Sequence, residues 1–129
     1  MFKQPTPEQG KYFFQNLQGK GSFVMLNLIE FNKKAVPLDL DEVLSGEEAY
    51  QLYLKNIQPE LAKMGSEIVF QGKTNSFLVG PIDEKWDVML LVKHQSIEKF
   101  LAFSTNKVYL ENVKYQSAAI KDFRLLPIL

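Results

Sequence analysis

Two segments of the chain combine the alternation of a β-strand with apolar side chains on both faces. In segment 23–31 one face carries Phe23, Met25, Asn27, Ile29 and Phe31, and the other carries Val24, Leu26, Leu28 and Glu30. In segment 86–93 one face carries Trp86, Val88, Leu90 and Val92, and the other carries Met89 and Leu91. A sheet with one wetted face alternates apolar and polar residues instead. These strands therefore predict a sheet that is covered on both sides.

The segments around these strands predict an α+β fold. Ser45-Gly46-Glu47-Glu48 is typical of a capping box, and the helix behind it carries an apolar stripe, which Pro59 should kink or divide before Gly65 ends it. A second helix should begin after Ser96, break at 104–106 and continue to Ala118. Further strands are expected at 66–71, 76–80 and 120–126. This order is the split βαβ pattern of ferredoxin-like folds, with both helices on one face of an antiparallel sheet.

We interpret residues 1–129 as one domain, with a core at 22–126 and an N-terminal extension at 1–21. The extension should form a short helix, because Thr6 is a capping residue and Pro7 suits the first helical position. Two core helices cover only one sheet face. Leaving five or six apolar side chains of the other face in water would forgo roughly 10 kcal/mol. A second copy applied sheet to sheet, giving a dimeric α+β barrel, would cover that face; the N-terminal helix folded across it is the alternative.

Composition narrows the possible partners and cofactors. Fifteen basic residues balance fifteen acidic ones, so no net field attracts nucleic acid or an anionic membrane. The chain has no cysteine, a single histidine, and no apolar run long enough for a signal peptide or a membrane span. The acidic segment Asp39-Leu40-Asp41-Glu42 lacks the glycine of a calcium loop. These features predict a cytoplasmic protein with no metal and no bound cofactor.

Several short motifs, in this order and spacing, resemble those of an uncharacterised bacterial family of unknown function within the dimeric α+β barrel superfamily. They are Met25-Leu26-Asn27-Leu28, Ser45-Gly46-Glu47-Glu48-Ala49-Tyr50 with Tyr53, Gly80-Pro81 before Trp86-Asp87, Ala118-Ala119, and Arg124-Leu125. The resemblance spans about residues 22–126. It implies a ferredoxin-like homodimer with a cleft between sheet and helices, where superfamily relatives bind small organic molecules. Gln116 stands where an arginine would be expected, which disfavours a carboxylate clamp.

Six residues are candidates for a site. His94, at the end of a central strand, could act as a general base or be a partly exposed residue with no role. Asn27 must hydrogen-bond either backbone or a ligand if it is buried. Tyr53 and Tyr109, with Tyr50, should face the sheet as core rings or ligand contacts. Trp86 could stack on a planar ligand or fill the barrel end. Arg124 could hold an anion or pair with Glu30 or Asp122.

These residues support three interpretations of function. In the first, a homodimer binds a small, partly apolar organic molecule in a cleft lined by Asn27, Tyr53, Trp86, His94 and Tyr109. In the second, the protein is a cofactor-independent monooxygenase or isomerase, in which His94 removes a proton and Asn27 or a tyrosine holds the oxyanion. In the third, it is a non-catalytic module whose groove is filled by its own side chains.

Overall fold

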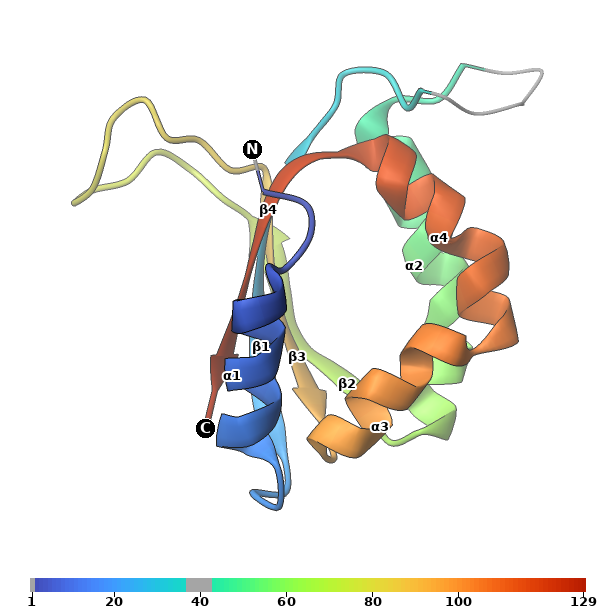
Figure 1. Ribbon diagram of the computed structural model, residues 1–129. Helices are drawn as coiled ribbons and strands as arrows, with labels where there is room; N and C mark the ends of the chain where they lie inside the picture. The colour runs from blue at the N-terminus through green and yellow to red at the C-terminus, as the bar shows by residue number, and fades with distance from the viewer. Residues whose placement is uncertain (1, 37–42) are drawn as a thin grey trace.

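The computed structural model of the protein describes residues 2–36 and 43–129, and its elements follow the predicted order closely. They are α1 (Pro7–Leu17), β1 (Phe23–Phe31), α2 (Gly46–Lys63), β2 (Glu67–Lys73), β3 (Val88–His94), α3 (Ile97–Ala102), a 3-10 turn (Phe103–Thr105), α4 (Lys107–Ala119) and β4 (Ile120–Ile128). The strands form one sheet in the order β2-β3-β1-β4, with antiparallel neighbours. Helices α2 and α4 lie along one side of it (Figure 1). The predicted ferredoxin-like arrangement is confirmed.

The structure corrects three predicted boundaries. Residues 76–80 are not a strand: β2 ends at Lys73, and residues 74–87 form a loop in which Gly80 has a φ of 150° and Pro81 lacks a backbone donor. Helix α2 is not divided at Pro59, because the buried residues Ile57 and Leu61 on either side pack against the sheet. Strand β4 continues through Pro127, which an edge strand tolerates. The acidic segment 39–42 lies outside the described residues.

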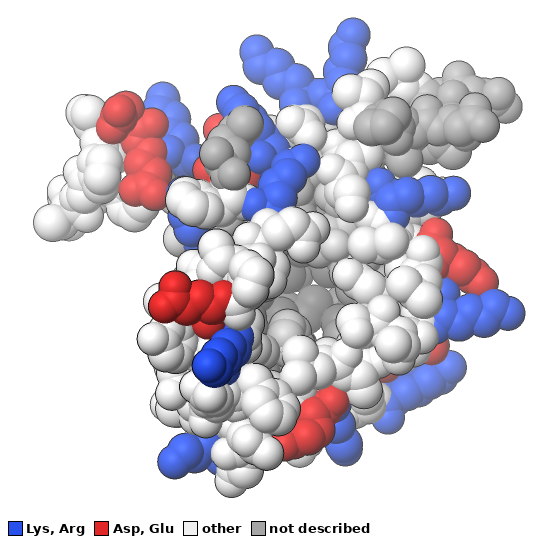
Figure 2. Space-filling view, in the orientation of Figure 1, with Lys and Arg blue, Asp and Glu red and all other residues white. Residues whose placement is uncertain are grey.

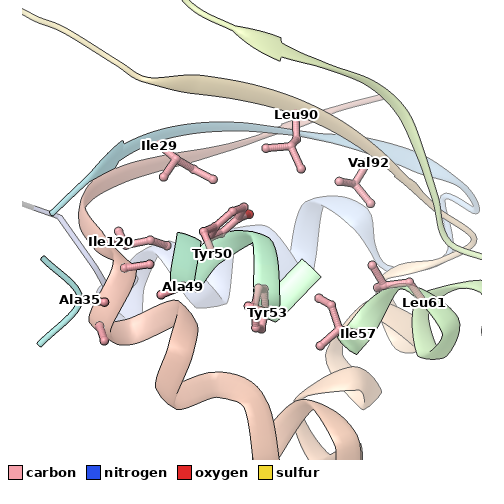
Figure 3. Close-up of a cluster of buried hydrophobic side chains, with 12 residues drawn as sticks. Ile29, Ala35, Ala49, Tyr50, Tyr53, Ile57, Leu61, Leu90, Val92 and Ile120 are labelled. Atoms are coloured by element: carbon pink, nitrogen blue, oxygen red, sulfur yellow. The ribbon is translucent and has the colours of Figure 1, made fainter. Parts of the chain in front are cut away.

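The sheet face toward α2 and α4, called the inner face here, carries the larger of two core clusters. Ile29 of β1, Leu90 and Val92 of β3, and Ile120 of β4 pack against the stripe of α2 that includes Tyr53. Figure 3 shows Ile29, Leu90 and Val92 projecting from the strands toward α2, and Tyr50 projecting from α2 toward them. The predicted division of β1 and β3 into two faces is confirmed for this side.

Helix α1 covers one end of the inner face and not the opposite side of the sheet. Its Leu17 is buried with Phe23 and Met25 of β1 and Ile97 of α3, and Phe13 packs beside them. This second cluster is separate from the first one. A capping box with Thr6 fixes the start of α1, so the predicted N-terminal helix is confirmed. The alternative in which this helix shields the second sheet face is wrong.

The opposite side of the sheet, called the outer face here, is apolar in its middle and charged near its ends. Strand register places Leu26 of β1 between Leu91 of β3 and Leu126 of β4. Phe70 lies beside Leu91 on β2, and Phe70 and Leu126 are 52% and 58% exposed. Within residues 2–36 and 43–129, no helix covers this face. The prediction from the sequence that both faces of the sheet are apolar is therefore confirmed.

Candidate functional site

Asn27 interrupts the inner face between the two core clusters. On β1 its neighbours on that face are Met25, which belongs to the smaller cluster, and Ile29, which belongs to the larger one. The Asn27 side chain is half-buried and donates its Nδ2–H to the Met25 carbonyl at 3.1 Å. Its Oδ1 accepts no hydrogen bond from the described residues. Leu125, opposite Asn27 in register, is 45% exposed although it lies on the inner face. The interior is therefore incompletely filled at this level.

Three tyrosines of α2 and α4 lie next to one another on the helix side of the interior. The ring centres of Tyr50 and Tyr53 are 5.7 Å apart, and those of Tyr53 and Tyr109 are 6.4 Å apart. Among the described residues their hydroxyls make no hydrogen bond. Of all the described residues, only Trp86 has a fully enclosed side-chain polar atom without a hydrogen-bond partner, its Nε1, so the tyrosine hydroxyls are not fully enclosed. The tyrosine hydroxyls therefore border space that a small molecule or water can enter.

Electrostatics keep these phenols neutral. Burial raises the pKa of Tyr50 and of Tyr109, and burial together with the neighbouring Tyr50 and Tyr109 raises the pKa of Tyr53. Neutral phenols are hydrogen-bond donors as well as acceptors. Figure 2 shows a recess between the side that carries α1 and the sheet and the side that carries α4. Two shallow depressions lie elsewhere, one at Glu47, Glu48 and Gln51 and the other beside Ser66. Both are open surface features, so the interior is the better candidate site.

His94 lies at the α1 end of the sheet and is buried, with only 5% of its surface exposed. Its Nδ1 lies 2.9 Å from the Ser66 hydroxyl, and its ring packs against Phe23 at 5.3 Å and Phe100 at 4.8 Å. Burial lowers the pKa of His94 to about 4. In the neutral ring, the tautomer decides whether Nδ1 accepts from the Ser66 hydroxyl or donates to it. The expectation of a partly exposed strand-end histidine is wrong, because α1 and α3 enclose this end of β3.

The strand register separates His94 from Asn27. Asn27 pairs with Leu90, and His94 lies four residues further along β3 on the same face. At about 3.3 Å per residue this spacing is about 13 Å. At this distance the Asn27 and His94 side chains do not both reach the same reacting atom of one small molecule.

Trp86 and Arg124 meet on the outer face. Arg124 Nη1 donates to Asp122 Oδ1 at 2.7 Å, and the Arg124 guanidinium lies 4.9 Å from the Trp86 ring centre and 4.7 Å from that of Phe2. Burial alone would raise the pKa of Asp122, but hydrogen bonds from Arg124 and from the Phe2 backbone outweigh it and lower that pKa. Of the two predicted ion-pair partners of Arg124, Glu30 and Asp122, it is Asp122 that pairs with it.

Trp86 was expected on the inner face, in phase with Val88. Its contact with Arg124, which is opposite Leu28 in register and points outward, places its ring on the outer face instead. Residues 86 and 87 precede β3, so strand alternation does not govern them; the Asp87 backbone N–H donates to Ile29 and the Asp87 carboxylate accepts from Phe31 N–H. Of the predicted lining residues, Tyr53 and Tyr109 lie next to each other on the helices, and Asn27 lies on the inner face of the sheet. The structure places His94 at the α1 end of the sheet and Trp86 on the outer face.

Sequence reasoning missed Ser66, the hydrogen-bond partner of His94. Ser66 follows Gly65, which has a positive φ of 79° and ends α2, so the residue enters β2 pointing toward β3. No sequence motif links positions 66 and 94. Leu125 was also missed as part of the incompletely filled interior, since a strand leucine is ordinarily core.

The fold and interior define a ferredoxin-like α+β protein, and comparison with solved structures places it within a family. Two crystal structures of the RPA0582 protein of Rhodopseudomonas palustris, one of which is described as a protein of unknown function, are 33% identical to the chain. They cover 97% of this chain and 91% and 93% of theirs, with TM-scores of 0.86 and 0.85. The chain belongs to the same family as RPA0582. Because the match covers 97% of the chain, it extends beyond the predicted span of 22–126 into α1.

Two more distant structures share the fold alone. One is a dimeric protein of unknown function with a ferredoxin-like fold from Bacteroides fragilis, with 12% identity, a TM-score of 0.52, and coverage of 86% of this chain and 96% of its own. The other is a dimeric ferredoxin-like protein of unknown function from Thermobifida fusca, with 10% identity, a TM-score of 0.51, and coverage of 88% and 94%. No family model and no curated protein sequence matches the chain.

Residues 2–36 and 43–129 contain no group of three or more histidine, aspartate or glutamate side chains placed to hold a metal ion. Within the same ranges, no helix combines the length and hydropathy needed to cross a bilayer.

Proposed function

We propose that the protein is a homodimer in which each subunit binds a small, partly apolar organic molecule inside the space between sheet and helices. The observation that carries the ligand site is the half-buried Asn27, which lies between two core clusters on the sheet face toward α2 and α4 and whose Oδ1 accepts no hydrogen bond from the described residues. Buried polar groups are ordinarily hydrogen-bonded. A ligand with one polar end and an apolar body would satisfy these groups and fill the gap. We further expect a cytoplasmic location, on the sequence grounds given above.

The outer face supports the homodimer. Its middle is apolar, while Lys93 and Glu67 lie near one end and Glu30, Asp122 and Arg124 lie near the other. An apolar centre with a charged rim is the usual composition of an interface core and its surroundings. The distant structures from Bacteroides fragilis and Thermobifida fusca are described as dimeric. Packing two such faces against each other would give a closed barrel with no helix required on that side.

The ligand site is tested by filling the gap. Asn27→Leu adds an apolar side chain at the level where the inner face is incompletely packed and removes the amide. Small planar phenols and aromatic acids would be screened by thermal shift on wild-type protein, and each hit would be titrated by calorimetry. We expect Asn27→Leu to weaken binding of a hit at least tenfold while remaining folded. Gln51→Leu, an exposed change on α2, is the matched control and should bind as wild type does. Unchanged affinity in Asn27→Leu would refute the site.

The enzymatic alternative is less well supported. It needs His94 as a base and Asn27 or a tyrosine as the oxyanion holder, yet about 13 Å of strand separates positions 27 and 94. His94 Nδ1 is also already hydrogen-bonded to the Ser66 hydroxyl. If a substrate is found, His94→Ala decides the matter: a loss of turnover with unchanged folding would restore the enzymatic interpretation.

A further inference from the structure

The loop between β2 and β3 is an apolar arm that residues 2–36 and 43–129 leave uncovered. The arm, defined here as residues 74–87, carries Phe77, Leu78, Val79 and Ile82, which are 43%, 100%, 88% and 89% exposed. Figure 1 shows it, in yellow, projecting from the sheet on the side away from α2 and α4. In Figure 2 the charges of the arm are confined to one part and much of its surface is uncharged. Leaving such side chains in water is unfavourable by about 25 cal/mol for each Å².

The base of the arm has a fixed geometry. The Thr74 backbone N–H donates to the Asp87 carbonyl at 3.1 Å, and the Thr74 hydroxyl donates to the Trp86 carbonyl. Asp87 is tied to β1 through Ile29 and Phe31. At the tip, Phe77 packs so closely on Gly80 that a Cβ there would lie 3.0 Å from the Phe77 ring. These contacts hold the arm in a defined direction, so its exposed side chains are presented together.

We infer that this arm reaches across the dimer interface and packs on the second copy of the chain. The inference rests on the proposed homodimer. The arm continues directly from β2, whose Phe70 is exposed on the outer face, and it projects toward the side that a copy docked on that face would occupy. A fully exposed apolar side chain presents roughly 150–200 Å². The four arm residues, with Val69, Phe70, Leu126 and Ile128, therefore expose on the order of 1,000 Å², compared with about 800 Å² for one side of a stable interface.

Two-fold symmetry makes the contact reciprocal. Each subunit would present its arm to its partner, and each would receive one. The same copy that covers the outer face would thus also cover the arm, which is why a second copy is favoured over an unrelated protein. Trp86, at the base of the arm, is 8% exposed and its Nε1 lacks a partner among the described residues. Because Arg124, at the charged end of the outer face, lies 4.9 Å from the Trp86 ring centre, the anchored base of the arm would lie at the rim of the interface.

A substitution at the arm tip tests the inference. Leu78→Asp changes a fully exposed side chain, so the monomer should fold as wild type does. We expect the dissociation constant of the dimer, measured by analytical ultracentrifugation, to rise at least tenfold. Leu110→Asp on α4, which is 56% exposed, is the matched control and should leave that constant unchanged. Leu126→Asp in the outer face should dissociate the dimer completely at micromolar protein.

The three variants separate failure of the arm from failure of the dimer. If Leu126→Asp dissociates the dimer while Leu78→Asp leaves its constant unchanged, the arm inference is refuted and the dimer stands. If wild-type protein is a monomer at micromolar concentration, both proposals fail. Because the chain contains no cysteine, a single Leu78→Cys substitution also gives a unique labelling site.

Photocross-linking from that site gives a direct readout. A benzophenone maleimide at Leu78→Cys should yield a covalent dimer, whereas the same label at Leu110→Cys should not. A cross-link confined to one subunit would refute the inference. So would a fluorescent label at position 78 that becomes buried on adding phosphatidylcholine vesicles but not on raising protein concentration, since the arm would then contact lipid.

Discussion

The inner and outer faces of the sheet are built from the same strands yet meet different surroundings. Ile29 and Leu28 are neighbours on β1. Ile29 is 1% exposed beneath α2, and Leu28 lies half-buried on the face that none of the described helices covers. Both faces are apolar, so hydrophobicity alone does not tell them apart. The difference shows that the connections between strands and helices decide which face of the sheet the described helices cover.

The largest expected effect on stability is found by comparing substitutions of Ile29 and Leu28. Ile29→Ala should lower the free energy of unfolding by about 2–5 kcal/mol at any protein concentration, because it leaves a cavity under α2. Leu28→Ala should have a smaller effect that depends on protein concentration, since part of its burial comes from the second copy. Urea unfolding at two protein concentrations, at least fiftyfold apart, measures both. Equal and concentration-independent losses would abolish the distinction between the faces.

A second prediction concerns the aromatic end of the inner face. The pKa of His94 is about 4 in the folded chain and near 6.5 when unfolded, so the unfolded state binds the proton more readily between these values. Stability is therefore full above pH 6.5 and falls as pH drops toward 4. Between pH 6.5 and 5 the loss should be roughly 2 kcal/mol.

The control for this prediction is His94→Gln, which keeps a polar partner for Ser66 and removes the only histidine. Urea unfolding at fixed protein concentration should show a flatter pH profile in the variant across that window. The pKa values of Asp122, Glu48 and Glu60 are also lowered, but those groups act below about pH 4.5. If the free energy of unfolding of the variant depends on pH as steeply as that of wild type, a group other than His94 causes the pH dependence.

The smallest expected effect concerns the start of the helix that covers the inner face. Ser45 caps α2 by accepting from Glu48 N–H at 3.0 Å, while the Glu48 side chain accepts from Ser45 N–H. Ser45→Ala should lower the free energy of unfolding by about 1 kcal/mol. Thr6→Ala removes the equivalent cap of the exposed helix α1 and should cost less in global stability. Thermal denaturation compares the two; a larger loss at Thr6 would mean that α1 matters more to the fold than α2.

Much of the fold was predictable because local signals agree with the tertiary structure. A capping residue followed by proline marked the start of α1, and a capping box marked that of α2. Period-two alternation assigned the residues of β1 and the body of β3 to their faces. The errors fall where tertiary contacts decide. Residues 76–80 have strand-like side chains but no neighbouring strand to pair with, and the environments of His94 and Trp86 depend on α1, α3 and β4. Asn27, Tyr53 and Tyr109 could be proposed from their positions in the sequence. How far each of these side chains is buried is decided only by the packing of helices on the sheet.

By itself, the sequence determined that the sheet would be apolar on both sides, in which order its elements would follow, and that a short helix would precede them. These properties depend on side chains a few residues apart. Only the tertiary structure decided that α1 lies beside α3 on the inner face, that Trp86 turns outward to Arg124, and that residues 74–87 project as an arm. Each of these depends on contacts between segments far apart in the chain. The conformational preferences of neighbouring residues do not specify which distant segments will meet.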